Sequence, residues 1–197
     1  MCLASAAAGK TRTLTERIRN LIEVKKVPSE KIAAITFTNM SAEEMKRRLG
    51  DIVGNAFVGT VHSYANKICI SQGIDTAKWI MNWDFDEILK KALTISPNKY
   101  PHVQHILVDE CQDLSTLEYT FLERIPADNR FYCGDARQNI YQFKGCTDEY
   151  LRTMYYNADY TKYYLIDNYR NTPNIITFAE EFVRNSGAIG PSAKPIK

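Results

Sequence analysis

The chain has 197 residues, which is long enough for one well-buried α/β domain with a small insertion and short for two domains. Its hydrophobic fraction of 45% and charged fraction of 24% are those of an ordinary soluble globular protein. The net charge of +2 excludes a global basic field of the kind that indicates nucleic-acid binding by itself, so any such binding must come from a local surface.

The five cysteines are odd in number and show no Cys-x-x-Cys spacing. We interpret them as reduced, largely buried side chains of a cytosolic protein. Residues 1–5 lack a basic leader and a sufficient apolar run, so they are not a signal peptide, and no segment approaches membrane-spanning length. We therefore expect a soluble, cytoplasmic protein without a membrane segment.

The first element is a short apolar stretch, Met1–Leu3, followed by Ala4-Ser-Ala-Ala-Ala-Gly-Lys-Thr11 and a helix predicted over residues 11–25. This order is that of a phosphate-binding loop, in which backbone N–H groups and the positive helix end face a phosphate chain. Lys10 would reach the terminal phosphates, and Thr11 would place its hydroxyl on Mg²⁺.

Two alanines, Ala7 and Ala8, stand in this loop where at least one more glycine is usual. If position 7 needs a positive φ, alanine there costs stability or distorts the phosphate cradle.

A second buried strand is predicted over Ile32–Phe37, and short hydrogen-bonding side chains, including Thr38 and Asn39, follow at its carboxyl end. Ser41-Ala-Glu-Glu44 has the pattern of a capping box, which predicts a helix starting at Ser41. Taken alone, Thr38 and Asn39 are best explained as residues that shape this turn.

A third strand is predicted over Phe57–Val61, and it is followed by His62 and by a helix through Ile68. A single histidine at a strand end is more often a turn residue than a catalyst. The pattern then changes: residues 71–104 predict a small helical insertion with a helix capped by Asp84-x-x-Glu87.

The central strand is the apolar run Ile106–Val108, which is typical of a strand buried on both faces of a parallel sheet. Asp109 and Glu110 follow at its carboxyl end, where open α/β sheets bind ligands. Such a pair needs a cation to stay ionised, and nucleotide-bound Mg²⁺ is the obvious candidate. The alternative, that the acidic strand end only caps the next helix, is disfavoured by the loop at residues 4–11.

Ser115-Thr-Leu-Glu118 is a second capping box, and a further strand is predicted over Arg130–Cys133. The segment Gln138–Gly145 mixes an amide, aromatic residues and a lysine and is too polar for a core, although the role of Tyr141 stays open.

A last strand is predicted over Lys162–Ile166, and Pro173 marks the start of the final helix. We expect residues 190–197 to form a linker or a frayed end.

In this order the blocks resemble the motifs of the UvrD/Rep family of superfamily 1 DNA helicases. The matching stretches, for motifs I, Ia, Ib, II, III and IV in turn, are Ser5–Thr11, Ile35–Asn39, Gly59–Tyr64, Val108–Asp113, Gly134–Gly145 and Asn168–Pro173. The resemblance implies a RecA-like P-loop NTPase domain with a mostly parallel sheet flanked by helices. Residues 1–197 would form one motor domain, with residues 71–104 as the insertion.

The resemblance implies ATP and Mg²⁺ as cofactors. The implied nucleotide-binding residues are Ser5, Ala6, Ala7, Ala8, Gly9, Lys10, Thr11, Arg12 and Tyr169, of which Arg12 and Tyr169 would pack against the adenine. Thr11 and Asp109 would hold Mg²⁺. Glu110 would polarise the attacking water, and Gln138 and Arg170 would stabilise the γ-phosphate, which is the positioning and charge stabilisation that phosphoryl transfer requires.

The other implied ligand is single-stranded DNA. By resemblance, the polar side chains Thr38, Asn39, Thr60 and His62 would contact the DNA backbone, and the aromatic side chains Tyr64 and Tyr141 would lie beside bases. Stacking is worth roughly 1–3 kcal/mol per base, which makes the aromatic residues more informative than net charge.

Family members also carry an upstream glutamine-bearing segment and a second motor domain, and neither lies within these residues. We therefore expect that this chain alone is not a competent helicase and needs a second motor domain or a partner protein. An alternative is a non-catalytic helicase remnant that acts as a DNA-binding or partner-binding module, favoured by Ala7 and Ala8. A generic phosphate-loop kinase or NTPase would leave the threonine-rich and aromatic stretches unexplained.

Overall fold

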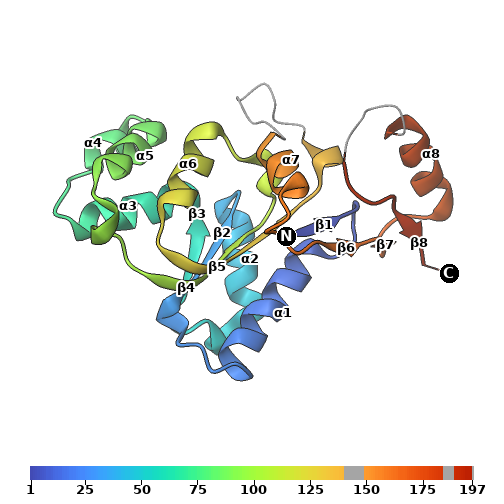
Figure 1. Ribbon diagram of the computed structural model, residues 1–197, viewed down its shortest axis with the longest axis horizontal. Helices are drawn as coiled ribbons and strands as arrows, with labels where there is room; N and C mark the ends of the chain where they lie inside the picture. Colours follow the sequence, from blue (N-terminus) through green and yellow to red (C-terminus); the bar gives the residue numbers. More distant parts are fainter. Residues whose placement is uncertain (140–148, 184–188, 197) are drawn as a thin grey trace.

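The computed structural model describes residues 1–139, 149–183 and 189–196. Its centre is a six-stranded sheet in the order β3-β2-β4-β5-β1-β6, and every neighbouring pair of strands is parallel (Figure 1). The strands are β1 (Cys2–Ala4), β2 (Ile32–Thr36), β3 (Phe57–Thr60), β4 (Val103–Val108), β5 (Ala127–Gly134) and β6 (Tyr163–Leu165).

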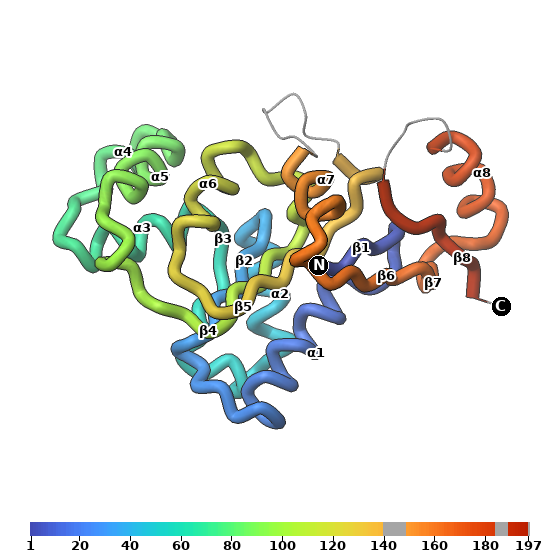
Figure 2. Tube along the Cα trace, viewed as in Figure 1, coloured from blue at the N-terminus to red at the C-terminus, as the bar shows by residue number. Residues whose placement is uncertain are grey.

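Helices cover both faces of this sheet, as the tube drawing makes visible (Figure 2). The helices of the described residues are α1 (Lys10–Glu23), α2 (Asn39–Leu49), α3 (Val61–Ser71), α4 (Ala77–Met81), α5 (Phe85–Thr94), α6 (Thr116–Arg124), α7 (Glu149–Tyr156) and α8 (Pro173–Val183). The predicted fold class, α/β with a mostly parallel sheet flanked by helices, is confirmed. No helix within the described ranges is both long and apolar enough to cross a membrane.

Strands β2 and β4 are largely buried on both faces, because successive side chains point to opposite sides and helices cover both of them. In β4, Ile106 and Val108 face the core that α3, α5, α6 and α7 cover, whereas Leu107 faces the core under α1 and α2. All five residues of β2 are buried, and its four apolar residues divide between the same two cores. This explains why both strands are continuous apolar runs in the sequence.

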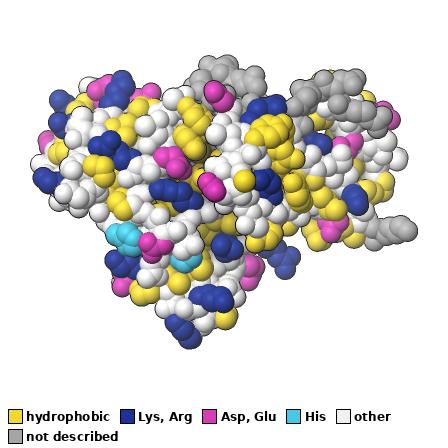
Figure 3. Space-filling view, viewed as in Figure 1, with side chains coloured by type: hydrophobic (Ala, Val, Ile, Leu, Met, Phe, Trp, Pro, Cys, Tyr) yellow, Lys and Arg dark blue, Asp and Glu magenta, His cyan; other side chains and the backbone are white. Residues whose placement is uncertain are grey.

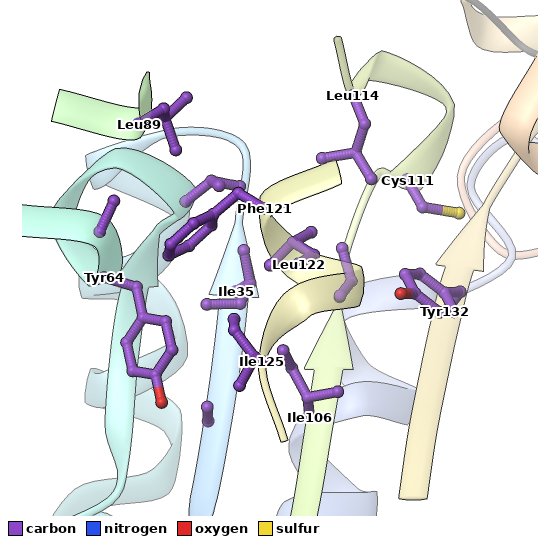
Figure 4. Packing of buried hydrophobic residues seen from close by; sticks show 14 of the residues in the cluster. Ile35, Tyr64, Leu89, Ile106, Cys111, Leu114, Phe121, Leu122, Ile125 and Tyr132 are labelled. Carbon is purple, nitrogen blue, oxygen red and sulfur yellow. The ribbon is translucent and has the colours of Figure 1, made fainter. Parts of the chain in front are cut away.

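The insertion at residues 71–104 contributes buried residues to the larger core. Helix α5 contacts α3 and α6, and its residues Ile88, Leu89 and Ala92 are buried there. Figure 4 shows Leu89 at the edge of the cluster that contains Phe121. The predicted cap of α5 is not formed, since the Asp84 side chain makes no capping hydrogen bond.

The start of α2 also differs from the prediction. The helix begins at Asn39 and not at Ser41, because Thr38 adopts an extended conformation and its hydroxyl accepts a hydrogen bond from the Ser41 backbone N–H at 3.0 Å. The capping box at Ser115 and Glu118, by contrast, is confirmed at the start of α6.

The C-terminal part differs from the expected linker as well. Lys194–Pro195 forms a short strand, β8, that pairs with β7 (Asp167–Asn168) in a second, two-stranded sheet. Helix α8 lies beside this sheet, at the opposite end of the molecule from α4 and α5 (Figure 1). Its Phe178 and Phe182 are 75% and 83% exposed.

Candidate functional site

A cavity of about 580 Å³ lies where β1, β4 and β5 end and the chain leaves β6. It is lined by Ala7, Ala8, Gly9, Lys10, Thr11, Arg12, Arg48, Glu110, Gln138, Tyr169 and Arg170. Because the strands are parallel, their carboxyl ends bring these four distant segments of the chain to one edge of the sheet. All of the lining residues except Arg48 were predicted as nucleotide-binding or catalytic residues.

The loop between β1 and α1 is held open as a cradle by hydrogen bonds to the strand beside it. The Ser5 backbone N–H donates to the Leu165 carbonyl at 2.8 Å, and the Asn168 amide donates to the Ala6 carbonyl at 3.0 Å. Gly9 has a φ of 86°, and Ala7 has a φ of 56°. Position 7 therefore does adopt the left-handed conformation in which alanine is disfavoured.

Lys10 and Thr11 extend from this loop toward the end of β4. The Lys10 side chain is 8% exposed, and its ammonium nitrogen lies 3.7 Å from a Glu110 carboxylate oxygen. The Thr11 hydroxyl donates a hydrogen bond of 2.9 Å to Asp109. These contacts join residues that are about 100 positions apart in the sequence, so the fold itself assembles them.

The two adjacent carboxyl groups differ in their surroundings. Asp109 is 3% exposed, and burial, followed by the neighbouring Glu110 charge, raises its pKa to about 6. Glu110 has a φ of 50°, which is unusual for a side chain of its size and turns the carboxylate toward the cavity. A buried carboxylate beside a second one would be stabilised by a cation. Hard cations such as Mg²⁺ prefer the oxygen donors that Thr11 and Asp109 supply.

The remaining predicted nucleotide residues line the far wall of the cavity. The Gln138 amide donates a hydrogen bond of 2.6 Å to Asp135, which orients its side chain. Tyr169 is 70% exposed, and Arg170 and Arg12 are also exposed. These long side chains are therefore free to meet a ligand.

Three predicted residues lie outside the lining of this cavity. Ser5 is buried, and its hydroxyl donates to the Ile166 carbonyl at 3.2 Å. Ala6 lines a smaller neighbouring cavity of about 190 Å³. Asp109 is buried and makes its hydrogen bond with Thr11, which lines the cavity.

The structure also brings in residues that sequence reasoning missed. Gln112 is 2% exposed and hydrogen bonds to Glu110, and Asp135 holds Gln138. Both stand inside the stretches that resemble motifs II and III, which was the available signal. Arg48 comes from the last turn of α2, and nothing in the sequence pattern indicates that it reaches the cavity.

The polar residues predicted to contact DNA are largely engaged in shaping helix starts. Thr38 and Thr60 are the N-caps of α2 and α3, and each accepts a hydrogen bond from a backbone N–H three residues later. Asn39 is exposed at the first position of α2. His62 is 29% exposed and lies between two carboxylates, 3.6 Å from Asp86 and 3.7 Å from Glu118.

The predicted aromatic contacts with bases need a correction. Tyr64 is 2% exposed, and its ring packs against Phe57 and Phe121 with centroid distances of 4.6 Å and 6.4 Å (Figure 4). It is a core residue with no free face for stacking, because α3 turns it toward the sheet. Tyr141 lies outside the described residues.

Comparison with known proteins gives related sequences over nearly the whole chain. DNA helicase II of Escherichia coli K12 is 26% identical over 283 residues, covering 96% of this chain and 39% of that protein. A putative ATP-dependent DNA helicase, R568, of Acanthamoeba polyphaga mimivirus is 28% identical over 197 residues, covering 90% of this chain and 27% of that protein. The ATP-dependent DNA helicase PcrA of Staphylococcus aureus is 25% identical, and the match covers 97% of this chain and 38% of that protein.

Among solved structures, the Pif1 helicase from Candida albicans is similar, with a TM-score of 0.44 and 14% identity over 95% of this chain and 41% of that one. The chain thus spans less than two fifths of the length of each curated relative named above. The sequence model described as UvrD/REP helicase N-terminal domain matches residues 1–90 and 70–159, two stretches that overlap over residues 70–90. Because these matches cover most of the chain, this protein belongs to the UvrD/REP helicase N-terminal domain family.

Proposed function

We propose that this chain is the nucleotide-binding part of an ATP-dependent DNA motor, which binds ATP with Mg²⁺ and contacts single-stranded DNA. The observation that carries the proposal is the joining of Lys10 and Thr11 to Glu110 and Asp109 at one cavity. A phosphate-binding lysine beside a carboxylate pair is the arrangement that phosphoryl transfer needs, because its catalysis is mostly positioning and charge stabilisation.

Each side chain has a distinct part in this proposal. Lys10 leaves its contact with Glu110 and binds the terminal phosphates, while Thr11 and Asp109 hold the metal ion. Mg²⁺ held by these two residues would supply neutralisation of the charge that develops on the phosphate oxygens. Glu110 then orients the attacking water and accepts its proton, and Gln138 and Arg170 face the γ-phosphate. Arg12 and Tyr169 pack against the adenine.

The DNA part of the proposal is supported by the names of the relatives, which are DNA helicases, and by the polar residues at the ends of β2 and β3, which are exposed after β2 and half-buried after β3. Figure 3 shows acidic and basic side chains interspersed on the visible face, without a large basic patch. Because the net charge of the whole chain is only +2, we expect weak DNA binding by this chain. Translocation would need the second motor domain or a partner protein.

The test is ATP turnover by this chain with Mg²⁺, measured with and without an oligo-dT strand. Turnover that DNA stimulates and that Glu110→Gln abolishes would mean that the site works without further domains. Binding of a fluorescent ATP analogue without turnover would mean that the chain supplies a half-site. Lys10→Ala should abolish binding in either case and leave the circular dichroism spectrum unchanged; binding that survives this change would contradict the assigned site.

A second candidate function is a non-catalytic DNA-binding or partner-binding module. The observation that favours it is the left-handed Ala7 in the phosphate loop. Absence of both nucleotide binding and turnover in the same assay, together with retained DNA binding, would favour this candidate.

A further inference from the structure

Gln112 is a buried amide at the centre of the site, and both ends of its side chain are engaged. Its Nε2 donates to Glu110 Oε2 at 2.9 Å and to Asp113 Oδ2 at 3.1 Å. Its Oε1 accepts a hydrogen bond of 3.0 Å from the Asp135 backbone N–H. The side chain therefore bridges the turn after β4 and the end of β5, and it is 2% exposed.

The bridge continues from β5 to the opposite wall of the cavity. The carboxylate of Asp135 accepts hydrogen bonds from the Gln138 side chain at 2.6 Å and from the Arg137 backbone N–H at 3.0 Å. Glu110 and Gln138, which both line the cavity, are thus connected through Gln112 and Asp135. This connection does not pass through the ligand space.

The turn after β4 also packs closely against the end of β5. A Cβ added at Gly134 would lie 2.6 Å from the Cys111 sulfur and 2.8 Å from Gln112 Oε1, so a larger residue would force them apart. A movement of the turn that carries Glu110 must therefore move the end of β5 or break the Gln112 hydrogen bonds, because close-packed interiors transmit displacements.

We propose that Gln112 is a positioning residue that couples Glu110 to Gln138. When a nucleotide draws Lys10 away from Glu110, the carboxylate shifts, and Gln112 transmits this shift through Asp135 to the amide that faces the γ-phosphate. Gln112 itself touches no ligand. The inference rests on the proposed nucleotide site and adds to it a side chain that sets two catalytic groups in register.

The test is a mutant cycle on the affinity for a non-hydrolysable ATP analogue with Mg²⁺, so that turnover is not needed. Affinities are measured for Glu110→Ala, Gln138→Ala and the double variant, first with Gln112 intact. If the two residues are coupled, the loss of affinity in the double variant should differ from the product of the two single-variant losses. We expect a difference of about threefold or more, as for residues in one network.

The cycle is then repeated with Gln112→Met and with Gln112→Glu. Methionine removes every hydrogen bond of the bridge at similar size, whereas glutamate keeps an acceptor for the Asp135 N–H and loses the donor to Glu110. In both backgrounds the loss of affinity in the double variant should equal the product of the two single-variant losses to within about twofold. Gln72→Met, at an exposed glutamine after α3, is the matched control and should leave the coupling intact.

Coupling that persists without Gln112 would overturn the inference, because it would then run through the nucleotide. A second measurement needs no Gln112 variant: Glu110→Ala should shift the amide resonance of Asp135 in the ligand-free chain, and an unchanged resonance would overturn the bridge. Failure of the intact chain to bind the analogue would count against the proposed function, whereas the resonance experiment would still decide on the bridge.

Discussion

At the scale of single residues, the phosphate loop contains one side chain in an unfavourable conformation. Ala7 has a φ of 56°, where the Cβ of an L-residue crowds the following carbonyl oxygen. Its carbonyl accepts a hydrogen bond from the Tyr169 N–H at 3.3 Å, so the loop is tied to the segment that carries two proposed nucleotide contacts. The strain is therefore located at the place where a ligand would be bound.

Replacing Ala7 with glycine should raise the free energy of unfolding by up to about 1 kcal/mol, because relief of the left-handed strain exceeds the added flexibility of the unfolded chain. Chemical denaturation of the two proteins measures the difference. Ala8→Gly is the control, since Ala8 is buried and is not among the residues with a positive φ. It should lower stability, and an equal gain from both changes would refute the strain argument.

A second residue-scale feature is a buried carboxyl group at the turn after β4. Asp113 is 5% exposed, and burial, followed by the Glu110 charge, raises its pKa to about 7 from a usual value of 3.8. Between these pH values the unfolded chain has released its proton and the native protein retains it. Since the native state then binds more protons, the free energy of unfolding falls as the pH rises from about 4 to about 7.

Asp113→Asn should remove this contribution to the pH dependence of stability and stabilise the protein above pH 7. Asparagine leaves one buried polar atom unpartnered, which keeps the gain on the order of 1–2 kcal/mol. Denaturation curves of both proteins between pH 4 and 8 give the difference, in which the shared contributions of Asp109 and Asp135 cancel. A difference that does not change with pH would show that Asp113 does not titrate in this window.

At the scale of elements, hydrophobic pattern predicted most of the architecture, because the strands are buried on both faces and the helices on one. The runs at Ile32–Phe37 and Ile106–Val108 could be assigned for that reason. The start of α2 could not be assigned from the sequence, since Thr38 and Ser41 are both good caps and the choice depends on where β2 ends. The burial of Tyr64 was missed because the helix phase of α3 is fixed by tertiary packing and not by the motif.

Thr38→Ala should lower the free energy of unfolding by about 0.5–2 kcal/mol, the usual cost of losing an N-cap, and Thr38→Ser should restore it. Thermal or chemical denaturation provides the measurement. The same two variants, tested for ATP turnover with and without the oligo-dT strand, separate a capping role of Thr38 from a DNA contact. If the alanine variant is as stable as the parent, the cap assignment at α2 is wrong.

At the scale of the whole molecule, the sheet and the insertion share one core. The pattern of residues 71–104 allowed a helical insertion to be predicted, but its packing depends on contacts with α3 and α6 that no local pattern encodes. The candidate cavity could be anticipated residue by residue only through the resemblance to a family. The Gln112 bridge could not be anticipated in this way, because it depends on the close approach of the turn after β4 to the end of β5.

Leu89→Ala, in α5, should lower the free energy of unfolding by about 2–5 kcal/mol, since this leucine is fully buried. Because the core is continuous, the loss should appear as a single shifted transition in calorimetry. Ile80→Ala, at a residue that is 42% exposed in α4, should have a small effect. Two separate transitions in the Leu89 variant would mean that the insertion unfolds independently.

The position of β1 between β5 and β6 has a consequence for the order in which the protein can fold during synthesis. Among the strands of this sheet β1 is synthesised first, yet it pairs with β5 and β6, and its loop is anchored by Leu165 and Asn168. Partners so distant in sequence make pairing slow and late. The phosphate loop therefore lacks these supporting hydrogen bonds until almost all of this chain has been translated. We expect that a nascent chain cannot bind nucleotide before then.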